Sequence, residues 1–203
     1  MGLLSPTTSL SRYRVEGKLD DPIIDTIAAG LKKNVITDID GNPSDQAVGW
    51  SSFQDPFKPD FDGSSFMIGT SIVFALRIDK KSIPNKMVQK HVATESAKRL
   101  KESGRDFLSA NEKKMIKDHV INTLNLKIPS TPNVYDVVWE YEAGDLWFFS
   151  NLKSANEELE TLFIKSFGVN LVRSIPYTMA ALDKRLTPEQ QDTLNKISSQ
   201  HDD

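Results

Sequence analysis

Residues Arg77 to Lys127 decide the architecture of this chain, and they read RIDKKSIPNKMVQKHVATESAKRLKESGRDFLSANEKKMIKDHVINTLNLK. This segment holds 13 Lys and Arg against 6 Asp and Glu, which is a formal charge of +7. The remaining residues hold 12 and 22, which is a formal charge of −10. Such a charge division predicts that the segment meets a polyanion while the rest of the molecule keeps it in solution.

The same segment predicts two helices joined by a short link. The first begins at Ile83-Pro84, runs to about Glu102 and ends at Ser103-Gly104, because glycine is favoured just after a helix. Its apolar stripe is narrow: Val88, Val92 and Leu100. The second helix begins at the capping box of Ser109 and Glu112 and runs to about Leu124. Its stripe has the i, i+4, i+8 spacing: Ile116, Val120 and Leu124. We therefore expect an antiparallel helical arm.

Strands and helices of an α+β body are predicted on both sides of this arm. The first half contains a strand at 10–15, a helix that Pro22 opens and that fades near 33–34, a short strand at 48–53 and a nearly continuous apolar strand at 66–78. The second half contains a hairpin of strands at 134–141 and 146–150 around Gly144, a helix from the capping box of Ser154 and Glu157 to Gly168, and a strand at 171–175. Mostly antiparallel sheets with packed helices follow, in a pseudo-symmetric β-α-β-β and β-β-α-β order.

This pattern predicts three parts. The body covers 1–78 and 130–180, the arm 79–129, and a C-terminal helix with its tail 181–203, where Thr187, Pro188, Glu189 and Gln190 resemble a helix start. The chain has 203 residues, 38% of them hydrophobic and 26% charged, which is ordinary for a globular protein. No apolar run approaches the roughly 18 residues of a membrane span, and no secretory signal is evident. Because cysteine is absent, disulfides and thiolate zinc sites are excluded, and we expect a cytoplasmic protein.

The lysines and arginines of the arm are the candidate ligands for nucleic-acid phosphates. They are Lys80, Lys81, Lys86, Lys90, Lys98, Arg99, Lys101, Arg105, Lys113, Lys114 and Lys117. Phe107 is the only aromatic residue of the arm, which argues against base stacking on single strands and for backbone contacts to duplex DNA. The alternatives are that the basic residues form an ordinary solvated helix face, or that the arm binds an acidic protein. His91 and His119 lie on the arm helices without metal-ligand spacing, and we expect surface residues or weak phosphate contacts there.

One acidic strand offers an alternative chemistry. Asp136, Glu140 and Glu142 share one strand face by alternation, and such carboxylates could hold Mg²⁺ for phosphodiester hydrolysis. The simpler interpretation is the wet face of a sheet whose other face carries Tyr135 and Trp139. The segment that begins at Asp38 resembles a calcium loop only at its start, so we predict a turn there. We predict no metal, no cofactor and no catalytic residue, with Mg²⁺-dependent exonuclease activity as the alternative.

Short motifs spread from Gly2 to Tyr177 resemble the RdgC family of recombination-associated DNA-binding proteins. Besides the lysine-rich arm that follows Ile83-Pro84, they are Gly2-Leu3-Leu4-Ser5, Ser11-Arg12-Tyr13-Arg14-Val15, Val48-Gly49-Trp50, Asp136-Val137-Val138-Trp139 and Phe167-Gly168. Relative to longer members, the chain corresponds to a short form without the C-terminal part.

The resemblance implies a nucleoid-associated homodimer that closes around duplex DNA. It implies sequence-independent binding through the arm and an effect on recombination by RecA. The family also carries an exonuclease label.

Overall fold

The computed structural model describes residues 2–174, 187, 189 and 190. The chain forms two compact units. The body unit consists of the described parts of Met1–Val35, Gly49–Leu76 and Val134–Asp203, and the arm unit consists of Ile36–Val48 and Arg77–Asn133. The sequence placed Ile36–Val48 with the body, whereas the contacts group it with the arm. The C-terminal helix predicted after Thr187 lies outside the described residues.

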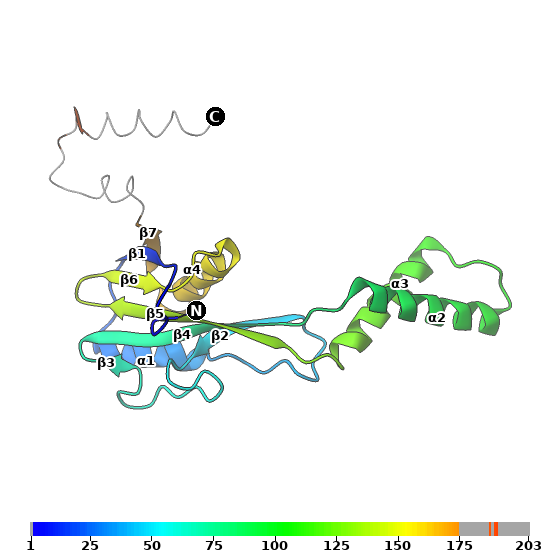
Figure 1. Ribbon diagram of the computed structural model, residues 1–203, viewed down its shortest axis with the longest axis horizontal. Helices are drawn as coiled ribbons and strands as arrows, with labels where there is room; N and C mark the ends of the chain where they lie inside the picture. Colours follow the sequence, from blue (N-terminus) through cyan, green and yellow to red (C-terminus); the bar gives the residue numbers. More distant parts are fainter. Residues whose placement is uncertain (1, 175–186, 188, 191–203) are drawn as a thin grey trace. The chain divides into compact units, whose positions relative to one another are not determined.

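The α+β class is confirmed, and the sheet is antiparallel and curled (Figure 1). Among the described residues its strands follow the order β2-β4-β5-β6-β1-β7, with β3 paired to β4. The strands are β1 Ser11–Glu16, β2 Gln46–Ser51, β3 Met67–Ile68, β4 Ser71–Lys80, β5 Thr131–Glu140, β6 Asp145–Phe148 and β7 Asn170–Arg173. The helices are α1 Ile23–Lys33, α2 Asn85–Ser103, α3 Ala110–Asn125 and α4 Lys153–Phe167. This order matches the predicted one, apart from the additional β3.

Most strand ends differ from the predicted ones by one to three residues, and two predicted features are wrong. The strand expected at 66–78 is interrupted at Gly69, whose φ of 62° turns the chain between β3 and β4. Glycine adopts that conformation without steric cost. The capping box expected at Ser154 is absent, because α4 already begins at Lys153 after Leu152. There the side-chain amide of Asn156 donates to the carbonyl of Leu152 at 2.8 Å.

The body unit has an aromatic core. Trp50 and Trp139 are fully buried, and each packs edge-on against a phenylalanine. The centroid of Trp50 lies 5.0 Å from that of Phe74, and the centroid of Trp139 lies 4.9 Å from that of Phe163 in α4. Such pairs add to the free energy of burying the rings. Trp147 is only half-buried, with the guanidinium of Arg12 5.6 Å from its ring.

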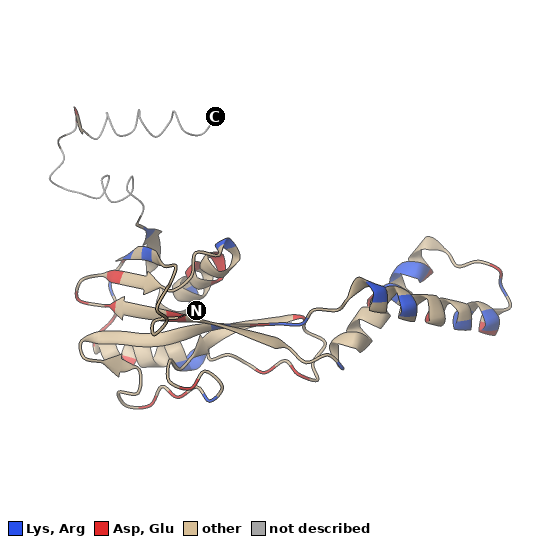
Figure 2. Cartoon of the chain, in the orientation of Figure 1, with Lys and Arg blue, Asp and Glu red and all other residues tan. Residues whose placement is uncertain are grey.

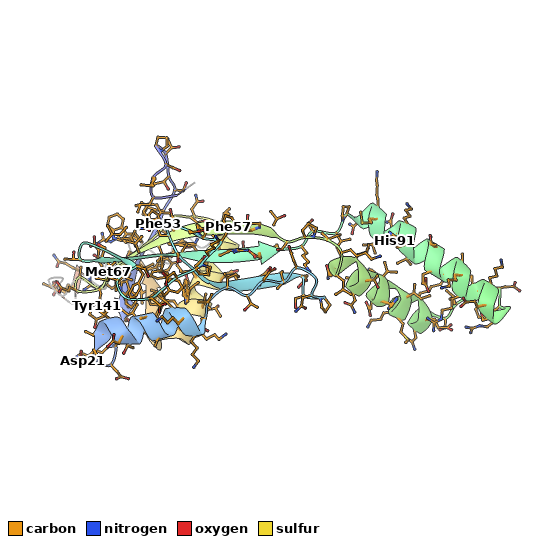
Figure 3. The ribbon with its side chains drawn as sticks, turned by 90° about the horizontal axis from the view of Figure 1, so that it is seen from below. Asp21, Phe53, Phe57, Met67, His91 and Tyr141 are labelled. Atoms are coloured by element: carbon orange, nitrogen blue, oxygen red, sulfur yellow. The ribbon has the colours of Figure 1, made fainter. Side chains whose placement is uncertain are left out.

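Helices α1 and α4 pack against each other at Gly30 (Figure 3). A Cβ atom at Gly30 would lie 2.7 Å from the carbonyl oxygen of Ser166 and 2.7 Å from the ring of Phe167. Only glycine permits this approach. Farther along α4, the buried hydroxyl of Tyr13 donates to Asn156 and Glu160, at 2.6 Å and 2.9 Å. Burial raises the pKa of this phenol, and the hydrogen bond to Glu160 raises it further.

Candidate nucleic-acid interface

Helices α2 and α3 form the predicted hairpin (Figure 1). The side chain of Ser109 accepts from the backbone of Glu112 while the Glu112 carboxylate accepts from the Ser109 backbone, which confirms the capping box. Gly104 ends α2 with φ 62°, in the left-handed region that favours glycine. The link between the helices is therefore defined by local interactions at both of its ends.

The hairpin has a small apolar core of its own. Leu108, Ile116, Val120 and Leu124 are buried in it. Partly buried side chains pack against this cluster: Ile83, Val88, Val92, Leu100 and Ile128. All of the apolar stripe residues predicted from the sequence belong to this core. Because α2 itself contains no fully buried residue, most of its surface faces solvent.

Besides Arg105, nine of the candidate cationic residues are exposed: Lys80, Lys86, Lys90, Lys98, Arg99, Lys101, Lys113, Lys114 and Lys117. Figure 2 shows basic residues along both arm helices. Within the described part of the chain, no carboxylate lies within ion-pair distance of any of these nine. Their charges are therefore not neutralised by neighbouring acids, as they would be on an ordinary salt-bridged helix surface.

Three of these lysines form a ridge on α2, and we call them the α2 ridge: Lys86, Lys90 and Lys98. At 3.6 residues per turn, spacings of 0, 4 and 12 lie at about 0°, 40° and 120° around the helix, so the three lysines spread over about a third of its circumference and on average point away from the apolar stripe. At 1.5 Å per residue the ridge is about 18 Å long. None of the three lysines forms an ion pair with a described carboxylate. Their long side chains can adapt to neighbouring phosphates.

Lys81 is a structural residue and leaves the set of candidate phosphate ligands. Its side chain is buried, and its ammonium donates to the carbonyls of Asn42 and Asn125, each at 2.6 Å. The side-chain amide of Asn125 also donates to the carbonyl of Pro43 at 3.1 Å. These bonds attach the end of α3 to the segment Ile36–Val48 within the arm unit. Sequence pattern alone does not distinguish Lys81 from the exposed Lys80 beside it.

Arg105 is also engaged within the arm. Its guanidinium pairs with the carboxylate of Glu112, and this contact, together with the hydrogen bonds from Ser109, lowers the pKa of Glu112 to about 2. Part of the positive charge of Arg105 is thus compensated inside the link between the helices. Nine exposed candidate residues without such an ion pair remain.

Asp40 lies in a turn, as the sequence predicts for this segment. Its carboxylate accepts from the backbone of Ser130 at 2.8 Å, and this hydrogen bond lowers the pKa of Asp40. The loop thus joins the strand that follows the arm by a hydrogen bond within the arm unit.

The acidic strand does not assemble a metal site. Asp136 and Glu140 share one face of β5, but they are four positions apart in the strand, which separates them by about 13 Å, too far to share a metal pair. Glu142 lies in the turn after β5, so the prediction that it belongs to the strand is wrong. Asp136 accepts a hydrogen bond from the backbone of Leu3 at 2.7 Å. Within the described ranges no three acidic or histidine side chains are grouped closely enough to bind a metal ion.

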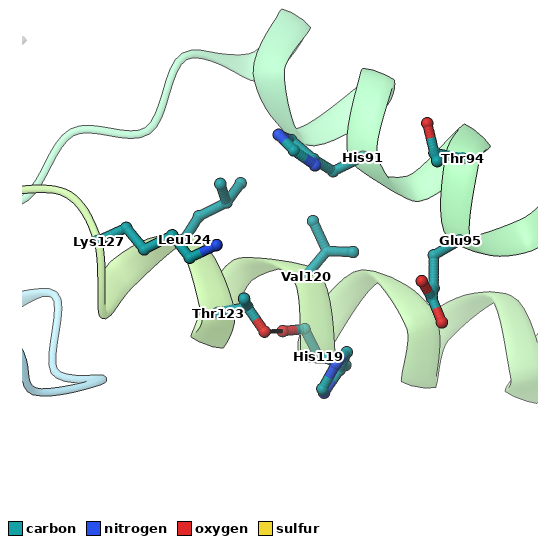
Figure 4. A pocket seen from close by; sticks show the side chains of 8 residues that line it. All are labelled: His91, Thr94, Glu95, His119, Val120, Thr123, Leu124 and Lys127. Atoms are coloured by element: carbon teal, nitrogen blue, oxygen red, sulfur yellow. Dashed lines mark hydrogen bonds between the residues drawn. The ribbon is translucent and has the colours of Figure 1, made fainter.

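A groove runs between α2 and α3 on one side of the hairpin (Figure 4). It holds about 140 Å³. Two imidazoles, one ammonium and one carboxylate line it: His91, His119, Lys127 and Glu95. The sequence indicated the two histidines only as surface residues or weak phosphate contacts. Their placement on one groove depends on the pairing of the helices.

Comparison with known proteins adds no identity: no protein-family model matches the chain, and no curated protein does either. None of the helices in the described ranges is long and apolar enough to cross a membrane.

Proposed function

We propose that this protein binds duplex DNA through the exposed cations of α2 and α3, without sequence preference. The observation that carries the proposal is the set of nine exposed, unpaired Lys and Arg side chains on an arm of formal charge +7. Cations that neutralise phosphates release condensed counterions, and this release supplies most of the affinity in sequence-independent binding. The resemblance to the RdgC family supports the same conclusion.

The absence of base readout follows from the residue types on the arm. Its exposed polar surface is dominated by lysine, a point charge that suits phosphates, and Phe107 is its one aromatic side chain. Stacking on single-stranded bases requires several aromatic side chains, so a duplex is the better partner. We also propose, on the resemblance, that the protein acts as a homodimeric clamp that modulates RecA-dependent recombination at the nucleoid.

Fluorescence anisotropy with a labelled duplex tests the binding proposal. If about six phosphates are neutralised, the logarithm of the association constant falls against the logarithm of salt concentration with a slope near −5. Two duplexes of unrelated sequence should give the same slope. Absence of binding at low salt, or binding that does not respond to salt, would refute the proposal. Binding to an acidic protein that DNA cannot displace would favour the protein-interaction alternative.

The α2 ridge provides the matched variants. Replacing Lys86, Lys90 and Lys98 with Gln removes three phosphate contacts, so the slope should become less steep by about 2.7. The control replaces three exposed lysines of the body unit, Lys58, Lys153 and Lys165, which changes the net charge equally. An equal loss in both triple variants would show that net charge, and not the arm surface, governs binding.

The clamp and its effect on recombination need separate measurements. Sedimentation equilibrium should give twice the mass of the chain. Strand exchange by RecA should slow when the protein is present, and the α2 ridge variant should slow it less. A monomer at all concentrations would remove the clamp, and unchanged strand exchange would remove the link to RecA. Neither result would affect the binding proposal.

A further inference from the structure

The groove between α2 and α3 contains ionisable groups that the phosphate-binding set does not use. His91 and Glu95 line it from α2, and His119 and Lys127 line it from the α3 side (Figure 4). All four belong to the arm unit, and His91, His119 and Lys127 are exposed. Two threonines also line the groove, but their hydroxyls donate to the carbonyls of Lys90 and His119, at 3.0 Å and 2.9 Å. The donors left for a ligand are therefore the imidazoles and the ammonium.

This groove lies on a different side of α3 from its lysines. His119 follows Lys117 by two residues, which is a rotation of about 200° around the helix. Lys113 and Lys117 are four residues apart and share a face. A phosphate in the groove would therefore not compete with the contacts made by Lys113 and Lys117. On α2, Lys98 follows His91 by seven residues and Glu95 by three, so it lies on the groove side of that helix and adds its positive charge there.

The charge of the groove depends on pH. Above the range in which histidine side chains titrate, Lys127 and Glu95 cancel, and the groove is formally neutral. Imidazole ordinarily changes charge between pH 5 and 8, and protonation of both histidines makes the groove formally +2. Both nitrogens of a protonated imidazole are donors, which suits a phosphate oxygen.

We propose that this groove is a second, proton-linked contact site for the phosphates of the nucleic-acid backbone. This inference rests on the proposed DNA binding and assigns to it a pH dependence. An anion that binds the protonated groove favours protonation, and by linkage a lower pH strengthens binding of the anion. The carboxylate of Glu95 opposes the phosphate at every pH at which it is ionised.

The test measures the salt dependence of DNA affinity at pH 8.0 and at pH 5.5. Two extra phosphate contacts steepen the slope by about 1.8, so a fourfold rise in salt weakens binding by about 12-fold more at the lower pH. The whole protein and a labelled duplex are used. The double variant His91→Gln with His119→Gln should retain its pH 8.0 affinity and lose the steepening. A His201→Gln variant, which changes a histidine outside the described residues, is the matched control and should keep it.

Each outcome decides between the two proposals. Salt-dependent binding with the same slope at both pH values overturns the groove site and leaves the DNA-binding function intact. A pH effect that persists in the double variant also overturns the groove site. If the protein binds DNA at neither pH, both the groove site and the DNA-binding function are overturned. Circular dichroism of every variant checks folding, and because both histidines are exposed the apolar core of the hairpin stays unchanged. In addition, Glu95→Gln should tighten binding at pH 8.0, and weaker binding there would contradict the site.

Discussion

Lys81 and Lys86 are five residues apart, and the structure predicts opposite effects when each is replaced by methionine. Methionine keeps an unbranched apolar chain that ends at the position of the lysine Cε, so the replacement removes the ammonium with its charge and its donors. The ammonium of Lys81 is buried and donates to two carbonyls, whereas Lys86 is exposed and unpaired on the α2 ridge. Lys81→Met should therefore change stability, and Lys86→Met should change DNA binding.

The hydrogen bonds of Lys81 set the size of the stability effect. Without the ammonium, the carbonyls of Asn42 and Asn125 lose their donor, and a buried carbonyl without a donor costs about 1–3 kcal/mol. Because Asn42 is exposed and Asn125 is buried, the penalty applies to the Asn125 carbonyl, and Lys81→Met should lower the free energy of unfolding by about 1–3 kcal/mol. Lys86→Met touches no buried group, and its effect should stay within about 0.5 kcal/mol. In DNA binding it should reduce the salt slope by about 0.9.

Urea denaturation followed by circular dichroism at 222 nm measures the stability effect, because α2 and α3 contribute 19 and 16 helical residues. Anisotropy titrations at several salt concentrations, under conditions where Lys81→Met remains folded, measure the slope. A Lys81→Met protein with unchanged stability and a reduced slope would refute the structural role that we assign to this lysine. A Lys86→Met protein with an unchanged slope would remove that residue from the interface.

Three further predictions concern packing and pH. Ile116→Ala, which truncates a side chain only 1% exposed in the hairpin core, should cost about 2–5 kcal/mol in urea denaturation, and the helix signal should show it. Gly30→Ala should destabilise by about 1–3 kcal/mol although alanine favours helices, because the new Cβ lies 2.7 Å from the Ser166 carbonyl; a more stable variant would contradict this packing. Because the pKa of Glu112 is lowered to about 2 from an ordinary 4.5, its contribution to stability is complete above pH 4.5 and is lost as the pH falls towards 2. Melting temperatures of wild type and Arg105→Gln between pH 2 and 5 check this, and the variant should lose less over that range.

The arm was predictable from the sequence because its determinants are local. The capping box of Ser109, the glycine after α2 and the i, i+4, i+8 stripe of α3 all act within a few residues of each other. Charge is additive along the chain, so the cationic character of the arm is also visible without a structure. Strand propensity likewise located most of the sheet, since alternation is a property of neighbouring residues.

The role of individual lysines depended on tertiary structure. Lys80 and Lys81 are adjacent and chemically identical, but only one of them meets carbonyls that lie 39 and 44 residues away along the chain. The presence of His91 and His119 along one groove has the same origin, because it depends on how two helices pack. The acidic residues of β5 are the converse case: alternation places Asp136 and Glu140 on one face, and the rise per strand residue already separates them by about 13 Å without any tertiary information. Local interactions determine the helices and strands, and composition determines the charge of each segment. Burial and contacts between residues far apart in the sequence decide which charged side chains remain available for binding.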